Sequence, residues 1–184
     1  ETDLQPQSGE IFSYLKFHNE LLDPIDSSGN FSISKQFNQF VNTFATKVNE
    51  VMITGFGMND LSGPSPARHF FEPYNSLSLT PSSGINASTI KVNPALLNNP
   101  KDLPLSAIAG EPGNTEVARN VARIAEDKTF LDNLTPVEYY SGYIARIGGA
   151  ARTAIEGLST TKLVDEQLNT QRESFMGVNL DEEA

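Results

Sequence analysis

The chain has 184 residues, with 13 Lys and Arg against 23 Asp and Glu, and a formal net charge of −10. This length suffices for one domain or two small ones, and the acidic balance disfavours binding to the phosphates of nucleic acids. The absence of cysteine excludes disulfides, thiolate zinc sites and cysteine nucleophiles. The sequence contains no run of 18 apolar residues, so it predicts no membrane-spanning helix.

Two helices are predicted in the first third of the chain. Apolar residues at roughly helical spacing predict the first over 11–22. The second, over 33–51, is much clearer, and Ser32 or Ser34 can cap its start while Gly55 can end it. Its apolar residues recur in steps of three and four, which places them on one face: Ile33, Phe37, Phe40, Val41, Phe44, Val48 and Val51.

The middle of the chain, 56–113, is predicted to be an excursion of loops and short strands, because it is rich in Gly, Pro, Ser and Asn. Within it, we expect the aromatic cluster 69–71 to fold back on the core. Residues 85–92 resemble a short β-strand that ends before a proline, and 94–98 resemble one helical turn.

Two further helices are predicted in the last third. Asn114 can cap a short one over 115–127. The last opens at Thr135-Pro136-Val137-Glu138, which combines an N-cap, a proline at the first helical position and a capping-box glutamate. If it continues to Met176, this helix is roughly 60 Å long at 1.5 Å per residue.

An apolar seam with heptad spacing follows this last helix and can be filled by a partner helix of the same chain or by a neighbouring subunit. It weakens at Thr161 and Asp165 and resumes through Leu168 and Phe175. An internal core is the simpler interpretation up to Leu158. The residues predicted to pack in the core or between subunits are Phe37, Phe40, Phe44, Val48, Val51, Tyr140, Ile144, Ile147, Ala151 and Leu158.

Together these elements predict a mainly α protein. We expect an elongated bundle of long antiparallel helices with a short β-hairpin or strand region and long loops, forming a single rod domain over 1–184. The two histidines, His18 and His69, lie in different segments, and neither stands beside a nucleophile motif. The turn at 26–30 lacks the spacing of a calcium loop. We therefore predict no catalytic, cofactor-binding or metal-binding residues and no enzyme.

The end of the chain carries a family resemblance. The run LNTQRESFMGVNLDEEA over 168–184 resembles the C-terminal signature of the flagellar hook-associated proteins of the first hook–filament junction zone. Met176 stands where that family has serine. The matching residues, interpreted as a hinge into a truncated terminal helix over 177–184, are Gly177, Val178, Asn179, Leu180, Asp181, Glu182 and Glu183.

Other segments agree with this resemblance. Val48-Asn49 followed by Thr54-Gly55-Phe56 is similar to the Val-Asn-x-x-His-x-x-Gly-Tyr stretch of the family, although Met52 replaces the histidine. The segment 68–71 is similar to its Arg-Asp-Phe-Phe, and 8–10 to the start of its Ser-Gly-Lys-Leu segment. Large outer domains between 71 and 85 and the two long terminal helices of the family are expected to be missing from this chain.

The resemblance implies a structural component of the bacterial flagellum that joins hook to filament. Such proteins are exported unfolded by the type III apparatus without a cleaved signal peptide, and they act outside the cell. The implied partners are the protein itself, the hook protein, the second junction protein, and an export chaperone that binds a C-terminal region beyond this chain. No nucleic acid or membrane insertion is expected.

Two other interpretations stay open. The chain can belong to another flagellar axial protein, such as the hook, distal rod or second junction protein. It can instead be a secreted binding module or adhesin on a flagellar scaffold. A protease version of the second interpretation needs a His-Glu-x-x-His helix, which this sequence lacks.

Overall fold

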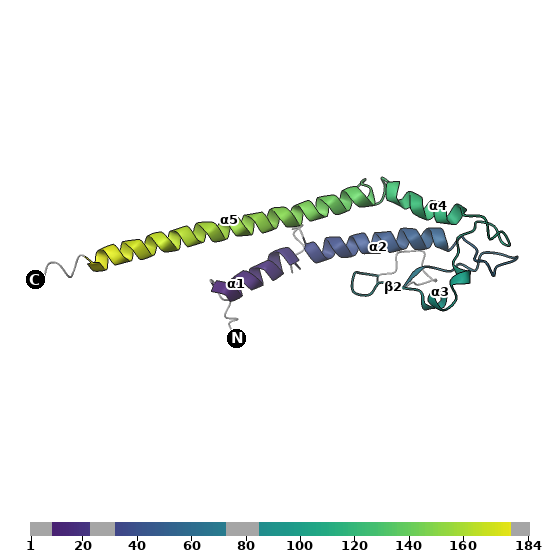
Figure 1. The fold of residues 1–184 in the computed structure, drawn as a ribbon, viewed down its shortest axis with the longest axis horizontal. Coiled ribbons are helices and arrows are strands. Elements are labelled where there is room, and N and C mark those ends of the chain that lie inside the picture. Colours follow the sequence, from purple (N-terminus) through teal and green to yellow (C-terminus); the bar gives the residue numbers. More distant parts are fainter. Residues whose placement is uncertain (1–8, 23–31, 73–84, 178–184) are drawn as a thin grey trace, which may run out of the picture. The chain divides into compact units, whose positions relative to one another are not determined.

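The computed structural model describes residues 9–22, 32–72 and 85–177. Helices hold most of these residues, which confirms the predicted mainly α class (Figure 1). None of the helices described is long and apolar enough to span a membrane. The elements are α1 (Gly9–Lys16), the π-helical turn η1 (Phe17–Leu22), α2 (Ile33–Met52), β1 (Phe71–Glu72), β2 (Lys91–Val92), α3 (Pro94–Asn98), the 3₁₀ turn η2 (Pro100–Asp102), α4 (Glu116–Arg123), the 3₁₀ turn η3 (Ile124–Glu126) and α5 (Pro136–Gly177).

The chain divides into two compact units, Glu1–Tyr143 and Ile144–Ala184. The first contains every described element up to the first two turns of α5, and the second contains the rest of that helix. The single rod domain over 1–184 and the elongated bundle stay predictions.

Helix α2 begins where the sequence predicts. The Oγ of Ser32 accepts a hydrogen bond from the backbone N of Lys35 at 3.1 Å, whereas Ser34 Oγ donates to the carbonyl of Leu22. Ser32 is therefore the cap. The helix ends at Met52, and Gly55 lies three residues beyond it, where a Cβ would be 2.6 Å from the backbone oxygen of Pro104. Gly55 thus permits a close backbone contact.

The expected strand over 85–92 is mostly wrong, because only Lys91–Val92 is strand. It pairs antiparallel with β1, with Phe71 opposite Val92 and Glu72 opposite Lys91. The preceding residues form a turn, since Asn86 Oδ1 accepts from the backbone N of Ser88 at 2.9 Å and of Thr89 at 3.1 Å. Such local side-chain bonds compete with strand pairing. The helical turn expected over 94–98 is confirmed as α3.

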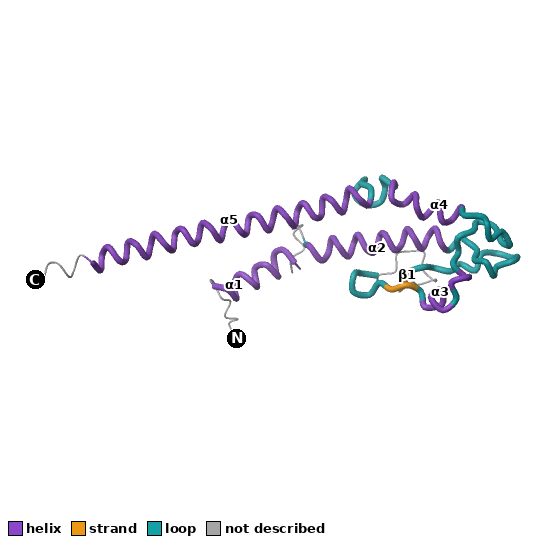
Figure 2. The backbone as a smooth tube through the Cα atoms, viewed as in Figure 1, coloured by secondary structure: helices purple, strands orange, loops and turns teal. Residues whose placement is uncertain are grey.

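The core of the first unit lies between α2, α4 and the turn that follows α4. Figure 1 shows α4 alongside α2, and Figure 2 shows the loops gathered between the end of α2 and the start of α4. Phe70 and Phe71 pack against this core, which confirms that the aromatic cluster folds back. The buried apolar cluster comprises Val48, Met52, Val117, Ile124 and Phe130.

The N-cap expected at Asn114 is one residue off, because Thr115 holds the N-cap position of α4 and makes no side-chain cap bond. Asn114 Oδ1 still accepts from the backbone N of Glu116 at 3.0 Å, and α4 with η3 covers most of the helix expected over 115–127. At the start of α5, Glu138 Oε2 accepts from the backbone N of Thr135 at 2.8 Å, and Thr135 Oγ1 accepts from the backbone N of Glu138 at 3.3 Å. The bond from Thr135 N lowers the pKa of Glu138, and the capping box is confirmed.

Adjacent leucines on α3 provide a matched test of this core. Leu96 is 4% exposed and Leu97 is 64% exposed. We expect Leu96→Ala to lower the free energy of unfolding by about 2–5 kcal/mol, because it removes packed methyl groups and leaves a cavity. Leu97→Ala should change it by less than about 0.5 kcal/mol. Urea denaturation measures both, and equal losses would contradict the assignment of the core.

An ion pair joins α2 to the turn after α4 and makes stability depend on pH. Lys47 Nζ donates to Asp127 Oδ2 at 2.6 Å, and the backbone N and Oγ1 of Thr129 donate to Oδ1 of the same carboxylate. The bond from Lys47, followed by those from Thr129, lowers the pKa of Asp127 from 3.8 to about 2. Ionised Asp127 therefore stabilises the fold above pH 3.8, and this contribution is lost as the pH falls through about 2.

We predict that Asp127→Asn lowers the melting temperature most at pH values above 4, where the wild-type carboxylate is ionised in both states. The difference between wild type and variant should shrink as the pH falls toward 2, because the wild-type carboxyl then protonates as well. Melting curves followed by circular dichroism over this range test the prediction. A difference that grows on acidification would contradict it.

Candidate interaction surface

The first two turns of α5 are held to α2 by aromatic side chains. The ring of Phe40 lies 5.3 Å from that of Phe130, 6.1 Å from that of Tyr139 and 5.9 Å from that of Tyr140. Further along, the rings of Phe37 and Tyr143 are 5.9 Å apart. Residue numbers fall along α2 as they rise along α5, so the two helices run antiparallel here, as predicted.

The buried positions at the start of α5 differ from those that the heptad pattern predicted. Tyr139 and Tyr143 are each 8% exposed, whereas the predicted seam residue Tyr140 is 44% exposed. Tyr143 also donates its hydroxyl to the carbonyl of Ile33 at 3.3 Å, and burial raises its pKa. Tyr143 shows the reason for the difference, because its ring packs on α2 while its hydroxyl reaches a backbone carbonyl of the same helix.

The predicted seam residues of α2 lie in or beside the core. Val48 is buried, and Phe37, Phe40 and Val51 are half-buried. Phe44 is 36% exposed, and its ring lies 6.0 Å from that of Phe71.

The seam residues beyond Tyr143 form a surface instead of a core. Ile147 is half-buried and Ala151 is exposed. Ile144 is 47% exposed and Leu158 is 58% exposed, so the interpretation of these two as internal core is wrong. We call this part of α5 the distal seam and define it as Ile144, Ile147, Ala151, Ala154, Leu158, Thr161, Asp165, Leu168, Arg172 and Phe175.

Glycines occur along the same helix, and no described residue packs against them. A Cβ at Gly142, Gly148, Gly149 or Gly157 would meet nothing within 4 Å. Each such glycine destabilises a helix by roughly 0.5–1 kcal/mol relative to alanine. Small residues on a helix also allow another backbone to approach closely, so the distal seam is our candidate interaction surface.

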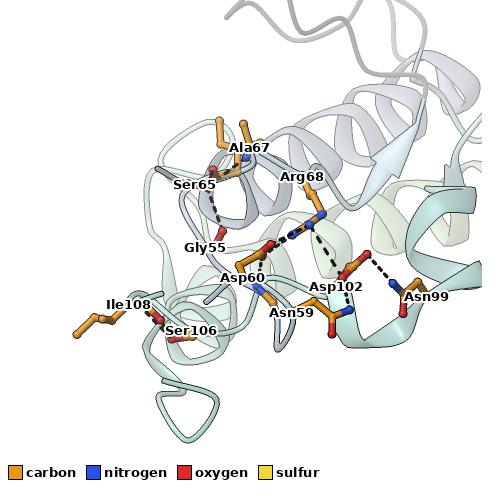
Figure 3. A network of polar contacts seen from close by, with 12 residues as sticks. Gly55, Asn59, Asp60, Ser65, Ala67, Arg68, Asn99, Asp102, Ser106 and Ile108 are labelled. Atoms are coloured by element: carbon orange, nitrogen blue, oxygen red, sulfur yellow. Dashed lines mark hydrogen bonds and ion pairs between the residues drawn. The ribbon is translucent and has the colours of Figure 1, made fainter. Parts of the chain in front are cut away.

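A polar network fixes the loop that follows α2. Figure 3 shows the guanidinium of Arg68 directed at Asp60, with two hydrogen bonds to that carboxylate, and Arg68 Nη2 is 4.0 Å from Asp102 Oδ1. Asn59 and Asn99 each donate to Asp102 at 2.7 Å. The bond from Arg68 lowers the pKa of Asp60, and the bond to Asp60 raises that of Arg68. The bond from Asn59 to Asp102 joins residues 43 positions apart and so ties this loop to η2.

A second polar clamp lies in the core and was not singled out by the sequence pattern. Asn49 is 1% exposed, and its Oδ1 accepts from the backbone N of Phe70 at 2.9 Å and of Phe71 at 2.8 Å. Its Nδ2 donates to the carbonyl of Phe71 at 2.9 Å. A buried amide satisfied by three backbone groups holds the segment before β1 against α2. Asn49 is a polar residue on the apolar face of the helix predicted over 33–51, and this exception to the pattern is the signal that could have identified the clamp.

The remaining sequence predictions concern chemistry and the chain end. Within 9–22, 32–72 and 85–177, no three His, Cys, Asp or Glu side chains are grouped so that they could hold a metal ion. His18 lies in η1, and His69 Nε2 is 3.6 Å from Glu72 Oε1. Of the family signature, Gly177 ends α5, while Val178, Asn179, Leu180, Asp181, Glu182 and Glu183 lie outside the described residues.

Comparison of the chain with protein-family models, with curated proteins and with solved structures gave no match. The functional argument therefore starts from the exposed side chains of the distal seam.

The clamp at Asn49 can be tested by truncation. We predict that Asn49→Ala lowers the free energy of unfolding by roughly 2–4 kcal/mol, because it leaves buried backbone groups without a partner. Asn59→Ala, which removes one exposed hydrogen bond, should cost less than about 1 kcal/mol. Urea denaturation with both variants is the measurement, and a loss at Asn49 no larger than that at Asn59 would refute the clamp.

Proposed function

We propose that this chain is a structural component of the bacterial flagellum that joins hook to filament as a hook-associated junction protein. In this proposal the chain has no catalytic activity and works by packing against other chains. It acts outside the cell, after export without a cleaved signal peptide. Its partners are further copies of itself, the hook protein and the second junction protein.

The observation that carries the structural part of the proposal is the exposed distal seam. Leu158 is 58% exposed, Leu168 is 59% exposed and Phe175 is 79% exposed, all at heptad spacing on one helix. Apolar side chains arranged in this way are suited to contact with a further helix. A protein that functions by assembly needs exposed apolar side chains to bind its partner chains, whereas a protein that binds only a small molecule does not need them.

The flagellar part of the proposal rests on the residues that resemble the junction family. Two of the resembling segments meet in space, because Asn49 binds the backbone of Phe70 and Phe71. Arg68, from the second of these segments, holds the loop between them through Asp60. This supports an interpretation in which the two segments form one structural unit and match the family together.

The test is complementation of a bacterial strain that lacks its own hook–filament junction protein. The full-length gene that encodes this chain is expressed there, and electron microscopy counts hooks with attached filaments. We predict that wild type and Leu163→Asp restore attachment and that Leu158→Asp does not. Leu163 is 61% exposed but lies off the distal seam, so it is matched to Leu158 in residue type and exposure.

Two results would contradict the proposal. Filaments that stay detached with the wild-type chain, although it is expressed and exported, would argue against the junction role. Attachment restored equally by Leu158→Asp would show that the distal seam takes no part in it.

A further inference from the structure

Two adjacent glycines lie in the interior of α5, just beyond the part of the helix that packs on α2. Tyr143 is buried and donates its hydroxyl to the carbonyl of Ile33 at 3.3 Å, whereas no residue from Ile144 to Phe175 is buried. The boundary between the two compact units falls at the same place, between Tyr143 and Ile144. Gly148 and Gly149 follow this boundary after about one helical turn, and both are exposed.

Neither packing nor backbone geometry requires glycine at these two positions. A Cβ at Gly148 or Gly149 would meet nothing within 4 Å, and neither residue has the positive φ that favours glycine. Each glycine nevertheless destabilises a helix interior by roughly 0.5–1 kcal/mol relative to alanine, because its backbone is less restricted. Flexibility of the backbone is therefore the property that the pair contributes to α5.

A side chain from the next turn weakens the helix at the same point. Thr153 Oγ1 donates to the carbonyl of Gly149 at 3.2 Å. In a regular α-helix this carbonyl accepts from the backbone N of residue 153, so the hydroxyl shares an acceptor of the helix itself. Such bonds from Ser or Thr to the carbonyl four residues earlier slightly destabilise a helix and often bend it.

The side chains around the pair give the helix little support. Residues 148–151 are Gly-Gly-Ala-Ala, so a full turn of α5 carries no side-chain atom beyond Cβ. Ion pairs and hydrogen bonds between side chains three or four residues apart stabilise a helix by about 0.2–0.5 kcal/mol each, and these four residues can form none. Sharp bends in helices that lack proline are often found at glycine or serine pairs.

The other two glycines inside α5 lack this combination. Gly142 lies between Tyr139 and Tyr143, which are both buried, so packing on each side restrains the helix there. Gly157 is a single glycine, although Thr161 Oγ1 donates to its carbonyl at 3.0 Å in the same way as Thr153 does at Gly149. The pair at 148–149 therefore has the largest local loss of helix stability next to the anchored turns.

We propose that Gly148 and Gly149 form a hinge at which α5 bends, and we call this pair the glycine hinge. A bend here redirects the helix beyond residue 149 while the packing of Tyr139 and Tyr143 on α2 stays unchanged. One chain thereby presents the same exposed side chains in more than one direction. The glycine hinge lies within a single chain, so it does not rest on the flagellar proposal.

Distances between two spin labels in the full chain test the glycine hinge. Because the sequence contains no cysteine, the variant Gln39→Cys/Glu156→Cys carries two labels only. Gln39 is exposed on α2, and Glu156 is exposed on α5 beyond the hinge but before Gly157. Labelled chain is mixed with an excess of unlabelled chain, so that distances arise within one copy.

Alanine at both hinge positions should narrow the measured distances. Residue 156 lies about 11 Å along the helix from the glycine pair, so a bend of about 30° moves it by roughly 6 Å. We therefore expect the distances to spread over about 6 Å more with the native glycines than with Gly148→Ala/Gly149→Ala. Alanine favours helix, and no described atom obstructs its Cβ, so circular dichroism should show that this variant folds.

Single substitutions at the other two glycines provide matched controls. Gly142→Ala and Gly157→Ala also replace exposed glycines of α5, but the first lies in the anchored turns and the second lies beyond the label. Neither should change the spread of distances. An equal spread with and without the hinge glycines, or equal narrowing by Gly142→Ala, would overturn the proposal. Failed complementation of the flagellar strain would leave these results unaffected.

Discussion

The aromatic contact centred on Phe40 is the interaction on which the arrangement of the first unit depends. Its ring touches the rings of Phe130, Tyr139 and Tyr140, and so joins α2, the turn before α5 and the start of α5. Aromatic side chains bury large areas and interact at these ring separations, so one residue can hold three segments together. Within the first unit, these contacts anchor the first two turns of the 42-residue helix α5.

The anchoring explains why one helix has two different surfaces. Tyr139 and Tyr143 are buried where α5 meets α2, whereas from Ile155 to Phe175 its large apolar side chains are exposed. Isolated helices are marginal in water, and most helical stability in proteins comes from packing of an apolar face. Exposed apolar side chains at heptad spacing are suited to contact with a further helix, and the proposed role in assembly is argued from this exposure.

Much of this fold could be predicted from sequence because its signals are local. The cap at Ser32 and the capping box at Thr135 depend on residues within one helical turn, and both were confirmed. The strand over 85–92 was mispredicted because the side chain of Asn86 forms a turn that hydrophobic pattern does not reveal.

The candidate surface and the polar clusters were harder to predict, because they depend on packing between distant segments. The heptad pattern identified the seam of α5, but it could not tell which part an internal partner covers. It favoured an internal core as far as Leu158, whereas Ile144 is already 47% exposed and Leu158 is 58% exposed. The bond between Asn49 and Phe71 joins residues 22 positions apart, and no local pattern encodes it.

Hydrogen exchange along α5 tests the central claim most directly. The account predicts slow amide exchange from Tyr139 to Tyr143 at every protein concentration, because packing on α2 protects this part. It predicts faster exchange beyond Ile144 in dilute solution. Slow exchange along the whole distal seam in a dilute monomer would contradict the account, because it would mean that the seam is already covered within one chain.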